Sequence, residues 1–522
     1  MKPIYYRDHM LVPADQRLAV LIPHTKTFVD PGTQQPMMLV PHKVDEAAVL
    51  RNLGYEVTPP VMLSYDWAGT KPFDAQRITT ALITSNLRSF VLNGLGTGKT
   101  RSALYAHDYL RQSTPGHGAM LAVAPMSTLH QTWEREVAMN FPHMKAVVLH
   151  GSKAKRIKLL NEKADVYIIN HDGVEVIVDQ LVEAAKSGWI SFGVLDELTV
   201  YKNATTELFK TTYKLARVLH RLTGMTATPM SKDASGAYGQ IKMIMPTVLD
   251  GVSFNRFRES VQTKVSQFRW VNRHDALETI HRRMQPSVRF TRDECYDIPD
   301  AQYVDVEVPL TAQQEAVFTE LVKENACTAL NVVAVNAADV GNKCLQVITG
   351  AVYDTNRVVI DMPCKPREEE LLRILESSEG KVIVFVPYKH SGKKVLDVVT
   401  KAGFTACEVN GDVSPAERNR VFTMFMQSTD PQVLVAHPKC MSHGLTLTEA
   451  STIVWWGLPD SLETYEQANG RITRAGQRRK QLIFRLHSTK YERKRYADFD
   501  RQADTQDTLL SLFESQDLGA LL

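Results

Sequence analysis

Long apolar stretches are missing from this sequence of 522 residues. A membrane-spanning helix needs about 20 consecutive apolar residues, and no run approaches that length. The first residues, MKPIYYRD, also lack the apolar core of a signal peptide. We therefore expect a cytosolic protein that has no membrane partner.

Cysteine is scarce, and its spacing argues against two further classes of protein. The six cysteines include no C-x-x-C pair, so neither a zinc site nor a disulfide framework is indicated. The net charge of +3 is weak evidence about partners, because a nucleic-acid site can be a local basic patch on a nearly neutral molecule. The charge is uneven, however, since residues 471–496 hold ten Lys or Arg and one acid, Glu492.

A glycine-rich turn lies between an apolar run at residues 89–92 and a helix-like segment at 100–110. Its sequence, NGLGTGKT, is typical of a phosphate-binding loop. Glycine lets backbone N–H groups turn toward phosphate, Lys99 can reach the outer phosphates, and the Thr100 hydroxyl can ligate Mg2+. The alternative is a flexible loop, and Asn93 stands where the full Walker pattern has its first glycine. The expected nucleotide-binding residues are Gly94, Gly96, Thr97, Gly98, Lys99 and Thr100.

Apolar runs alternate with helical segments in two blocks of the chain, at about residues 73–246 and 367–486. This pattern predicts an α/β protein with two parallel sheets covered by helices, which bind ligands at the carboxyl ends of their strands. Residues 250–365 interrupt the pattern and predict a helical insertion. A hairpin at residues 20–40 and a helix at 44–53 predict a small N-terminal α/β module, which we expect to choose the substrate. The predicted domains are 1–70, 71–248, 249–365, 366–488 and 489–522.

An acidic pair follows the apolar run at residues 192–195. A carboxylate at the end of such a strand can hold the Mg2+ of MgATP while its neighbour orients and deprotonates the attacking water. We therefore assign Asp196 to the metal and Glu197 to the water. An Asp-Glu pair alone fits a helix start as well. The phosphate loop earlier in the chain favours the catalytic interpretation.

The second block has no phosphate loop, so the two lobes predict a shared cleft to which the second lobe supplies charge. The candidate sequence is QANGRITRAGQ, residues 467–477, in which Arg471 and Arg474 would share one face of a helix. Arginines that stabilise the γ-phosphate raise the rate by about 10^3 to 10^5 in related phosphoryl transfers. A basic patch for DNA phosphates is an equal alternative on spacing alone.

Taken in order, these elements resemble the Swi/Snf-type DNA translocases of helicase superfamily 2, over about residues 73–500. The sequence FDAQ at 73–76 resembles the family's adenine-reading Q element. Motif Ia is similar to APMSTLHQTWE at 124–134, which holds Ser127 and Thr128. The sequence DELT occupies motif II, with Thr199 where the family usually has His.

Three further stretches complete the resemblance. They are LTGMTATP at 222–229 for motif III, SHGLTL at 442–447 for motif V, and residues 467–477 for motif VI. By this match Arg471 and Arg474 become arginine fingers. The other nucleotide-binding residues that the resemblance implies are Gln76, Gly444 and Gln467. The implied contacts to nucleic-acid phosphates are Ser127, Thr128, His171, Lys389, Ser442 and His443.

The resemblance implies an ATP-dependent translocase on double-stranded or branched DNA, with ATP and Mg2+ as cofactors. ATP binding would close the two lobes over the phosphates, and hydrolysis would reopen them. The alternatives are a fork-remodelling or annealing helicase, an RNA helicase, and a non-motor binding module with a degenerate nucleotide site. Compact proteins of this kind with a short N-terminal module are typical of phage and bacterial genomes. We expect a monomer in the cytoplasm, which is that of a bacterial host if a phage encodes the protein.

Overall fold

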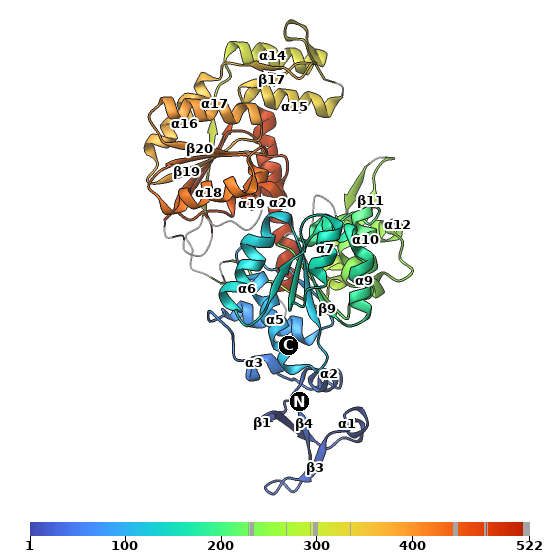
Figure 1. Ribbon diagram of the computed structural model, residues 1–522. Coiled ribbons are helices and arrows are strands. Elements are labelled where there is room, and N and C mark those ends of the chain that lie inside the picture. The colour runs from blue at the N-terminus through green and yellow to red at the C-terminus, as the bar shows by residue number, and fades with distance from the viewer. Residues whose placement is uncertain are drawn as a thin grey trace. The chain divides into compact units, whose positions relative to one another are not determined.

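The structure is a computed structural model, which describes residues 1–227, 229, 234–267, 269–292, 294–295, 301–334, 336–441, 447–473, 477 and 479–514, without the side chains of 337–338, 415 and 504–514. The chain forms two compact units. The first consists of Met1–Cys295 with Thr505–Leu522, and the second is Tyr296–Asp504. Each unit is built around one parallel sheet (Figure 1).

Seven parallel strands form the large sheet of the first unit. The strands at its centre, such as β6 and β8, are buried at every position, because helices cover both faces and leave no place for polar alternation. In spatial order the strands are β13 (Ser287–Val288), β5 (Arg88–Val91), β10 (Arg221–Met225), β9 (Ile190–Asp196), β6 (Ala119–Ala124), β8 (Val166–Asn170) and β7 (Ala146–Val148).

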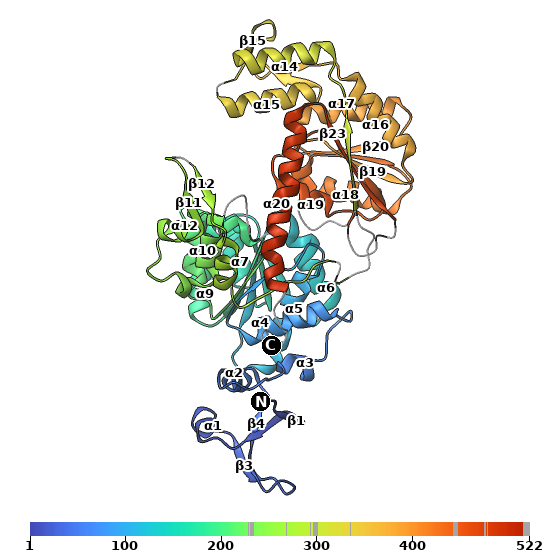
Figure 2. The ribbon, with the colours of Figure 1, turned by 180° about the vertical axis from the view of Figure 1, so that it is seen from behind.

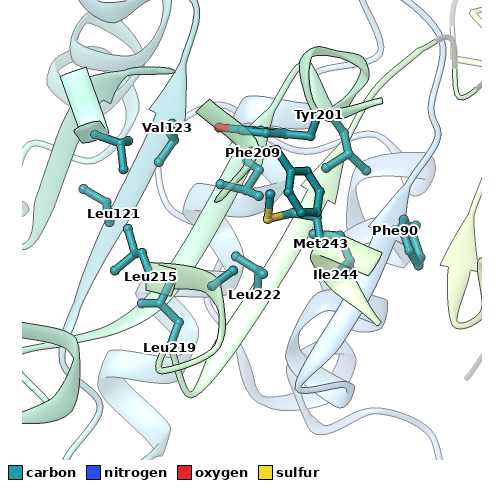
Figure 3. Packing of buried hydrophobic residues seen from close by; sticks show 14 of the residues in the cluster. Phe90, Leu121, Val123, Tyr201, Phe209, Leu215, Leu219, Leu222, Met243 and Ile244 are labelled. Atoms are coloured by element: carbon teal, nitrogen blue, oxygen red, sulfur yellow. The ribbon is translucent and has the colours of Figure 1, made fainter. Parts of the chain in front are cut away.

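Two apolar clusters cover the two faces of this sheet. Successive side chains of a strand point to opposite faces, so Leu121 and Val123 join the cluster drawn in Figure 3 while Met120 and Ala122 join the other. The helices around the sheet are α4 (Asp74–Ser85), α5 (Lys99–Ser113), α6 (Arg135–Asn140), α7 (Lys153–Leu160), α8 (His171–Val176), α9 (Val178–Lys186), α10 (Glu207–Ala216), α11 (Ala237–Ile244), α12 (Phe254–Val261) and α13 (Ala276–Arg283). A hairpin of β11 (Gln262–Lys264) and β12 (Trp270–Asn272) joins α12 to α13.

Six parallel strands form the sheet of the second unit. In spatial order they are β14 (Ala301–Glu307), β23 (Gln481–His487), β22 (Ala450–Trp455), β19 (Lys381–Phe385), β21 (Val433–Ala436) and β20 (Ala406–Val409). The helices that follow or precede these strands are α16 (Lys365–Ser377), α17 (Lys389–Lys401), α18 (Pro415–Gln427), α19 (Leu462–Asn469) and α20 (Lys490–Glu514). In this unit α14 (Ala312–Glu324) and α15 (Ala337–Ile348) pack together, with the small hairpins β15 (Ala326–Cys327) to β16 (Val332–Val333) and β17 (Ala351–Tyr353) to β18 (Val359–Asp361) beside them (Figure 2).

The N-terminal residues fold as an antiparallel sheet in the order β1 (Ile4–Tyr6), β2 (His9–Pro13), β4 (Pro36–Pro41) and β3 (Lys26–Val29), followed by α2 (Val44–Asn52) and α3 (Pro60–Ser64). The predicted hairpin corresponds to β3 and β4. The two strands pair from Lys26 opposite Leu39 to Val29 opposite Pro36. Its first strand is shorter than predicted. Residues 20 and 21 belong to α1 (Gln16–Leu21), because Asp15 accepts a hydrogen bond from the Arg17 N–H and so starts a helix there.

The predicted α/β class, with two RecA-like lobes, is confirmed by the two parallel sheets. Residues 250–365 are not wholly helical, however. Two strands from this stretch, β13 and β14, join the large sheets as edge strands. Their patterns are weak signals, because β13 has two residues and β14 alternates between exposed and half-buried positions. None of the described helices is long and apolar enough to span a bilayer.

Candidate nucleotide site

The phosphate loop connects the end of β5 to the start of α5. Gly96 and Gly98 have φ values of 83° and 80°, in the left-handed region that glycine adopts at low cost. The Thr97 hydroxyl donates to the Gly94 carbonyl oxygen at 2.9 Å and closes the loop on itself. The loop ends at the N-terminus of a 15-residue helix, where backbone N–H groups and the helix dipole favour an anion.

The Lys99 ammonium group lies within this loop. Its Nζ donates to the carbonyl oxygens of Asn93 at 2.8 Å and Gly94 at 2.9 Å. These acceptors are neutral, and a hydrogen bond from a cation to an anionic oxygen is stronger. The geometry therefore suits an exchange of the two carbonyls for phosphate oxygens. The Thr100 side chain, one residue further, is half-buried at the start of α5.

The departure from the Walker pattern at Asn93 has a structural explanation. Its side-chain Nδ2 donates to the Thr79 hydroxyl on α4 at 2.8 Å, and its Oδ1 accepts from the Phe290 backbone N–H at 3.0 Å. Asn93 is 1% exposed, so both bonds are shielded from water. The asparagine thus ties the first residue of the loop to α4 and to the chain after β13. Sequence reasoning noted this residue as a departure and assigned it no role.

Gln76 packs directly against the phosphate loop. Its Oε1 accepts from the Phe73 backbone N–H at 3.0 Å, and the side chain is 2% exposed. A Cβ added at Gly98 would lie 2.0 Å from Gln76 Nε2. The predicted adenine-reading glutamine is therefore in contact with the loop that holds the phosphates. This contact requires a glycine at position 98 in addition to the positive φ.

Asp196 ends β9, at the same edge of the sheet at which β5 enters the phosphate loop. Burial raises the pKa of the Asp196 carboxyl above its ordinary value, and the Lys99 charge and the Trp133 indole oppose this shift. The Trp133 Nε1–H donates to Asp196 Oδ2 at 3.1 Å. Glu197 follows with a φ of 60°, a strained conformation for a residue with a Cβ. Strained backbone conformations are concentrated at functional sites. The conformation of Glu197 is therefore consistent with the catalytic role predicted for this residue.

The chain after β13 forms an outer wall of the loop that sequence reasoning missed. The Gly94 N–H donates to the Phe290 carbonyl oxygen at 2.8 Å, and Arg289 Nη1 donates to the Leu92 carbonyl oxygen at 3.2 Å. A Cβ at Gly94 would lie 3.2 Å from Arg289 Nη1, so the two segments are in close contact. Burial raises the pKa of the Cys295 thiol to about 11, against the smaller effects of Arg289 and Lys99. A two-residue strand in a basic stretch carries no signal that would have placed it here.

The predicted nucleic-acid contacts in the first unit divide into one exposed residue and two buried residues. Ser127 is exposed at the start of motif Ia. Thr128 is 6% exposed, and its hydroxyl donates to the Pro125 carbonyl oxygen at 2.9 Å. His171 is 7% exposed, its Nδ1 lies 2.8 Å from the Tyr201 hydroxyl, and burial lowers its pKa to about 4. The side chains of Thr128 and His171 are thus buried within the lobe, and their contact with nucleic-acid phosphates stays a prediction.

In the second unit Arg471 does not lie on a helix as expected. The helix α19 ends at Asn469, and Gly470 caps it, so Arg471 lies in the turn beyond. Arg471 is 1% exposed, and its Nε donates to the Gln467 carbonyl oxygen at 2.9 Å. Lys389 is exposed at the start of α17 and pairs with Asp412 at 2.6 Å. The predicted residues Ser442, His443, Gly444 and Arg474 lie outside the described part of the chain.

The residues of the first unit fit MgATP. Within the part of the chain that the structure describes, no three His, Cys, Asp or Glu side chains gather as a metal site. The Asp196 carboxylate and the Thr100 hydroxyl are oxygen donors of the kind that Mg2+ takes. Mg2+ prefers such sparse oxygen sites, because phosphate oxygens and water supply its remaining ligands.

Two family models match this chain. The model of the SNF2-related domain matches residues 86–359, and the model of the helicase conserved C-terminal domain matches residues 366–476. The first match covers the phosphate loop, Asp196 and the chain after β13. The second covers residues of the second unit up to the turn that holds Arg471.

The individual proteins and structures that this chain resembles share 28% sequence identity or less with it. The putative protein p41 of Acyrthosiphon pisum secondary endosymbiont phage 1 is 28% identical over 412 residues, covering 74% of this chain and 85% of that protein. The ISWI chromatin-remodeling complex ATPase ISW1 of Saccharomyces cerevisiae is 21% identical over 448 residues, covering 80% of this chain but 38% of the yeast protein. Among solved structures, the SWI2/SNF2 ATPase core of Sulfolobus solfataricus in complex with dsDNA is similar with a TM-score of 0.41 and 18% identity, covering 88% of this chain and 96% of that one.

Proposed function

Because the chain belongs to the SNF2-related family and is an ATP hydrolase of helicase superfamily 2, we propose that it couples ATP hydrolysis to movement along double-stranded or branched DNA. The observation that carries the proposal lies within one unit. The phosphate loop and the Asp196–Glu197 pair are both at the carboxyl edge of one sheet, and the Lys99 charge acts on Asp196. A binding module with a degenerate site would not need this arrangement.

Each residue of the site has a separate role in this proposal. The N–H groups of residues 94–100 and the Lys99 ammonium hold the phosphates, as the loop conformation and the start of α5 favour. Glu197 orients the attacking water and accepts its proton. Asp196 and Thr100 would hold Mg2+, whose charge neutralises the phosphate oxygens when it is bound. Gln76, in contact with Gly98, would sense whether the loop has rearranged around a nucleotide.

We propose that the second unit supplies Arg471 and Arg474 to the phosphates during hydrolysis. For Arg471 the support is its buried guanidinium, whose Nε is held by the Gln467 carbonyl oxygen at 2.9 Å and which therefore has a defined direction. A basic patch for DNA would instead be expected at the surface. Gly444 belongs to this proposal through the motif resemblance alone.

Contacts with DNA are proposed for two exposed residues and for two that the motif resemblance alone supplies. Ser127 and Lys389 are both exposed, and the motif resemblance adds Ser442 and His443. Lys389 would exchange its pairing with Asp412 for a DNA phosphate, at little cost because exposed ion pairs contribute about 0–1 kcal/mol. Contacts of this kind carry no sequence information, so the affinity should fall with salt by a log-log slope of about 0.9 per phosphate neutralised.

The test measures ATP turnover with duplex DNA, branched DNA, single strands and RNA. The Glu197→Gln substitution removes the base and keeps the shape of the side chain. We expect it to leave nucleotide binding intact and to lower DNA-stimulated turnover by about 10^2- to 10^4-fold. Stimulation by RNA alone would favour the RNA helicase, and stimulation by forks alone would favour the fork-remodelling enzyme. Turnover of the Glu197→Gln protein at the wild-type rate would overturn the assignment of the base.

Movement along the duplex needs an assay of its own. Opening a base pair costs about 1.4 kcal/mol of stacking on average, and tracking phosphates along an intact duplex avoids that cost. We expect ATP-dependent displacement of the third strand of a triplex and poor unwinding of a tailed duplex. Efficient unwinding of long duplexes would contradict a translocase in favour of a processive helicase.

A further inference from the structure

The indole of Trp133 contacts the proposed metal-binding carboxylate. Its Nε1–H donates to Asp196 Oδ2 at 3.1 Å, and Trp133 is 0% exposed. A hydrogen bond to a charged group contributes more than one between neutral groups, and burial strengthens it further. The contact spans 63 residues of sequence, from motif Ia to motif II. A core tryptophan with no further role could direct its indole N–H to any backbone carbonyl.

Trp133 occupies an unusual helical turn. Residues 126–140 run through a 3-10 turn, then the π-helical turn Leu129–Glu134, then α6. Within the π-turn the Arg135 N–H reaches back five residues to the His130 carbonyl oxygen. Turns of this type are rare in proteins, and many of those that occur lie at functional sites. This one lies directly beside the nucleotide site.

Trp133 lies on the buried face of this helical segment. Leu129, Trp133 and Val137 are spaced by four, and all three are buried at 1% exposure or less. Residues four apart lie on one face of a helical segment, so these three side chains share the buried face from which Trp133 contacts Asp196. The first turn of the same helical segment holds Ser127, which is exposed and which we propose to contact DNA.

We propose that Trp133 is a positioning residue that transmits the state of motif Ia to the Mg2+ ligand Asp196. The inference rests on the proposed function, in which motif Ia contacts DNA. The indole holds Oδ2 of Asp196 and so restricts the orientation of the carboxylate that would ligate Mg2+. DNA that binds at Ser127 acts on one end of a rigid helical segment whose other end holds this carboxylate. ATP hydrolysis thereby responds to DNA through Trp133.

The experiment removes the indole N–H of Trp133 in two variants. In the first, benzothienylalanine keeps the shape of the ring and has sulfur in place of the N–H. In the second, phenylalanine replaces Trp133. The control is Trp456→Phe, because Trp456 is also 0% exposed and its Nε1–H donates at 3.0 Å to the Thr349 backbone carbonyl oxygen. Thermal unfolding of all three proteins shows whether they fold.

The decisive measurement is the affinity for ADP with and without Mg2+. We expect the Trp133 variants to bind ADP without Mg2+ as tightly as the wild type does. The factor by which Mg2+ raises their affinity for ADP should be about tenfold smaller than in the wild type. Their ratio of DNA-stimulated to basal turnover should fall about tenfold or more. The Trp456→Phe protein should keep both values.

Two outcomes would overturn the proposal. One is a folded benzothienylalanine protein with the wild-type response to Mg2+ and to DNA. The other is an equal loss of ADP affinity with and without Mg2+, which would show that Trp133 only supports the core. If the wild type itself shows no stimulation by DNA, the proposed function fails, while the Mg2+ measurement still decides whether Trp133 positions Asp196.

Discussion

Replacing Gly98 with alanine tests two features of the phosphate loop at once. The residue has a φ of 80°, and a Cβ there would lie 2.0 Å from Gln76 Nε2 and 3.1 Å from Gln76 Cδ. The left-handed conformation costs a residue with a Cβ about 1–2 kcal/mol. Moving Gln76 aside also breaks the bond from the Phe73 N–H to Gln76 Oε1, which contributes about 1 kcal/mol. Together they amount to about 2–3 kcal/mol.

If this free energy is lost from the nucleotide-bound state, ATP and ADP affinity should fall by about 30- to 150-fold. The assay is a titration with a fluorescent ADP analogue. The control is Gly116→Ala, because Gly116 has a φ of 75° and a Cβ there would meet nothing within 4 Å. Gly116→Ala should lower the free energy of unfolding by about 1–2 kcal/mol and leave nucleotide affinity unchanged.

A second substitution separates the steric effect from the backbone effect. In the double variant Gly98→Ala with Gln76→Ala, the clash is gone and the strain in φ remains. The double variant should therefore be weakened by less than the sum of the two single effects, and the difference measures the coupling. Wild-type affinity in Gly98→Ala, or strict additivity of the two changes, would refute the close contact between Gln76 and the loop.

Three further predictions follow from buried groups. Burial lowers the pKa of His117 to about 4, so the unfolded chain, in which this pKa is near 6.5, binds a proton there that the folded chain does not; between pH 6.5 and pH 4 this one group should lower the free energy of unfolding by up to about 3 kcal/mol, measured by urea denaturation as the difference between the wild type and His117→Asn, and an equal pH dependence of the two proteins would contradict this. Asn93→Ala removes the bonds to Thr79 and Phe290 and should lower ADP affinity by about tenfold, whereas unchanged affinity would show that the loop needs neither bond. Arg471→Ala should lower DNA-stimulated turnover by about 10^3-fold or more with little change in DNA affinity, and loss of DNA binding with turnover retained at saturating DNA would instead support a basic patch.

The predictable parts of this protein are those whose signal is local. The phosphate loop was readable because its glycines and Lys99 lie within eight residues, and the acidic pair because it follows an apolar strand. The strands of both sheets were largely readable from apolar runs, as at β6, which is buried throughout. The edge strands β13 and β14 were not, because an edge strand is held by pairing with its neighbour, and short or alternating sequences do not reveal that neighbour.

Motif spacing also failed to distinguish an exposed side chain from a buried one. Ser127 and Thr128 are adjacent in motif Ia, yet the first is exposed and the second donates to the Pro125 carbonyl oxygen. The spacing of Arg471 and Arg474 predicted that both lie on one face of a helix. The helix α19 ends before Arg471, because Gly470 caps it. A helix end of this kind depends on the backbone conformation at one residue, which a periodic pattern does not report.

The loop at residues 93–100 shows which parts of a sequence pattern are physically required. Only Gly96 and Gly98 within it have positive φ, so glycine is needed there for backbone conformation. Position 93 has an ordinary φ, and a side chain is tolerated. The carboxamide of Asn93 joins α4 to the chain after β13. The backbone carbonyl oxygen of Asn93 accepts a hydrogen bond from Lys99. The Asn93 side chain therefore joins two further segments to the loop at a position where the loop does not need the conformational freedom of glycine.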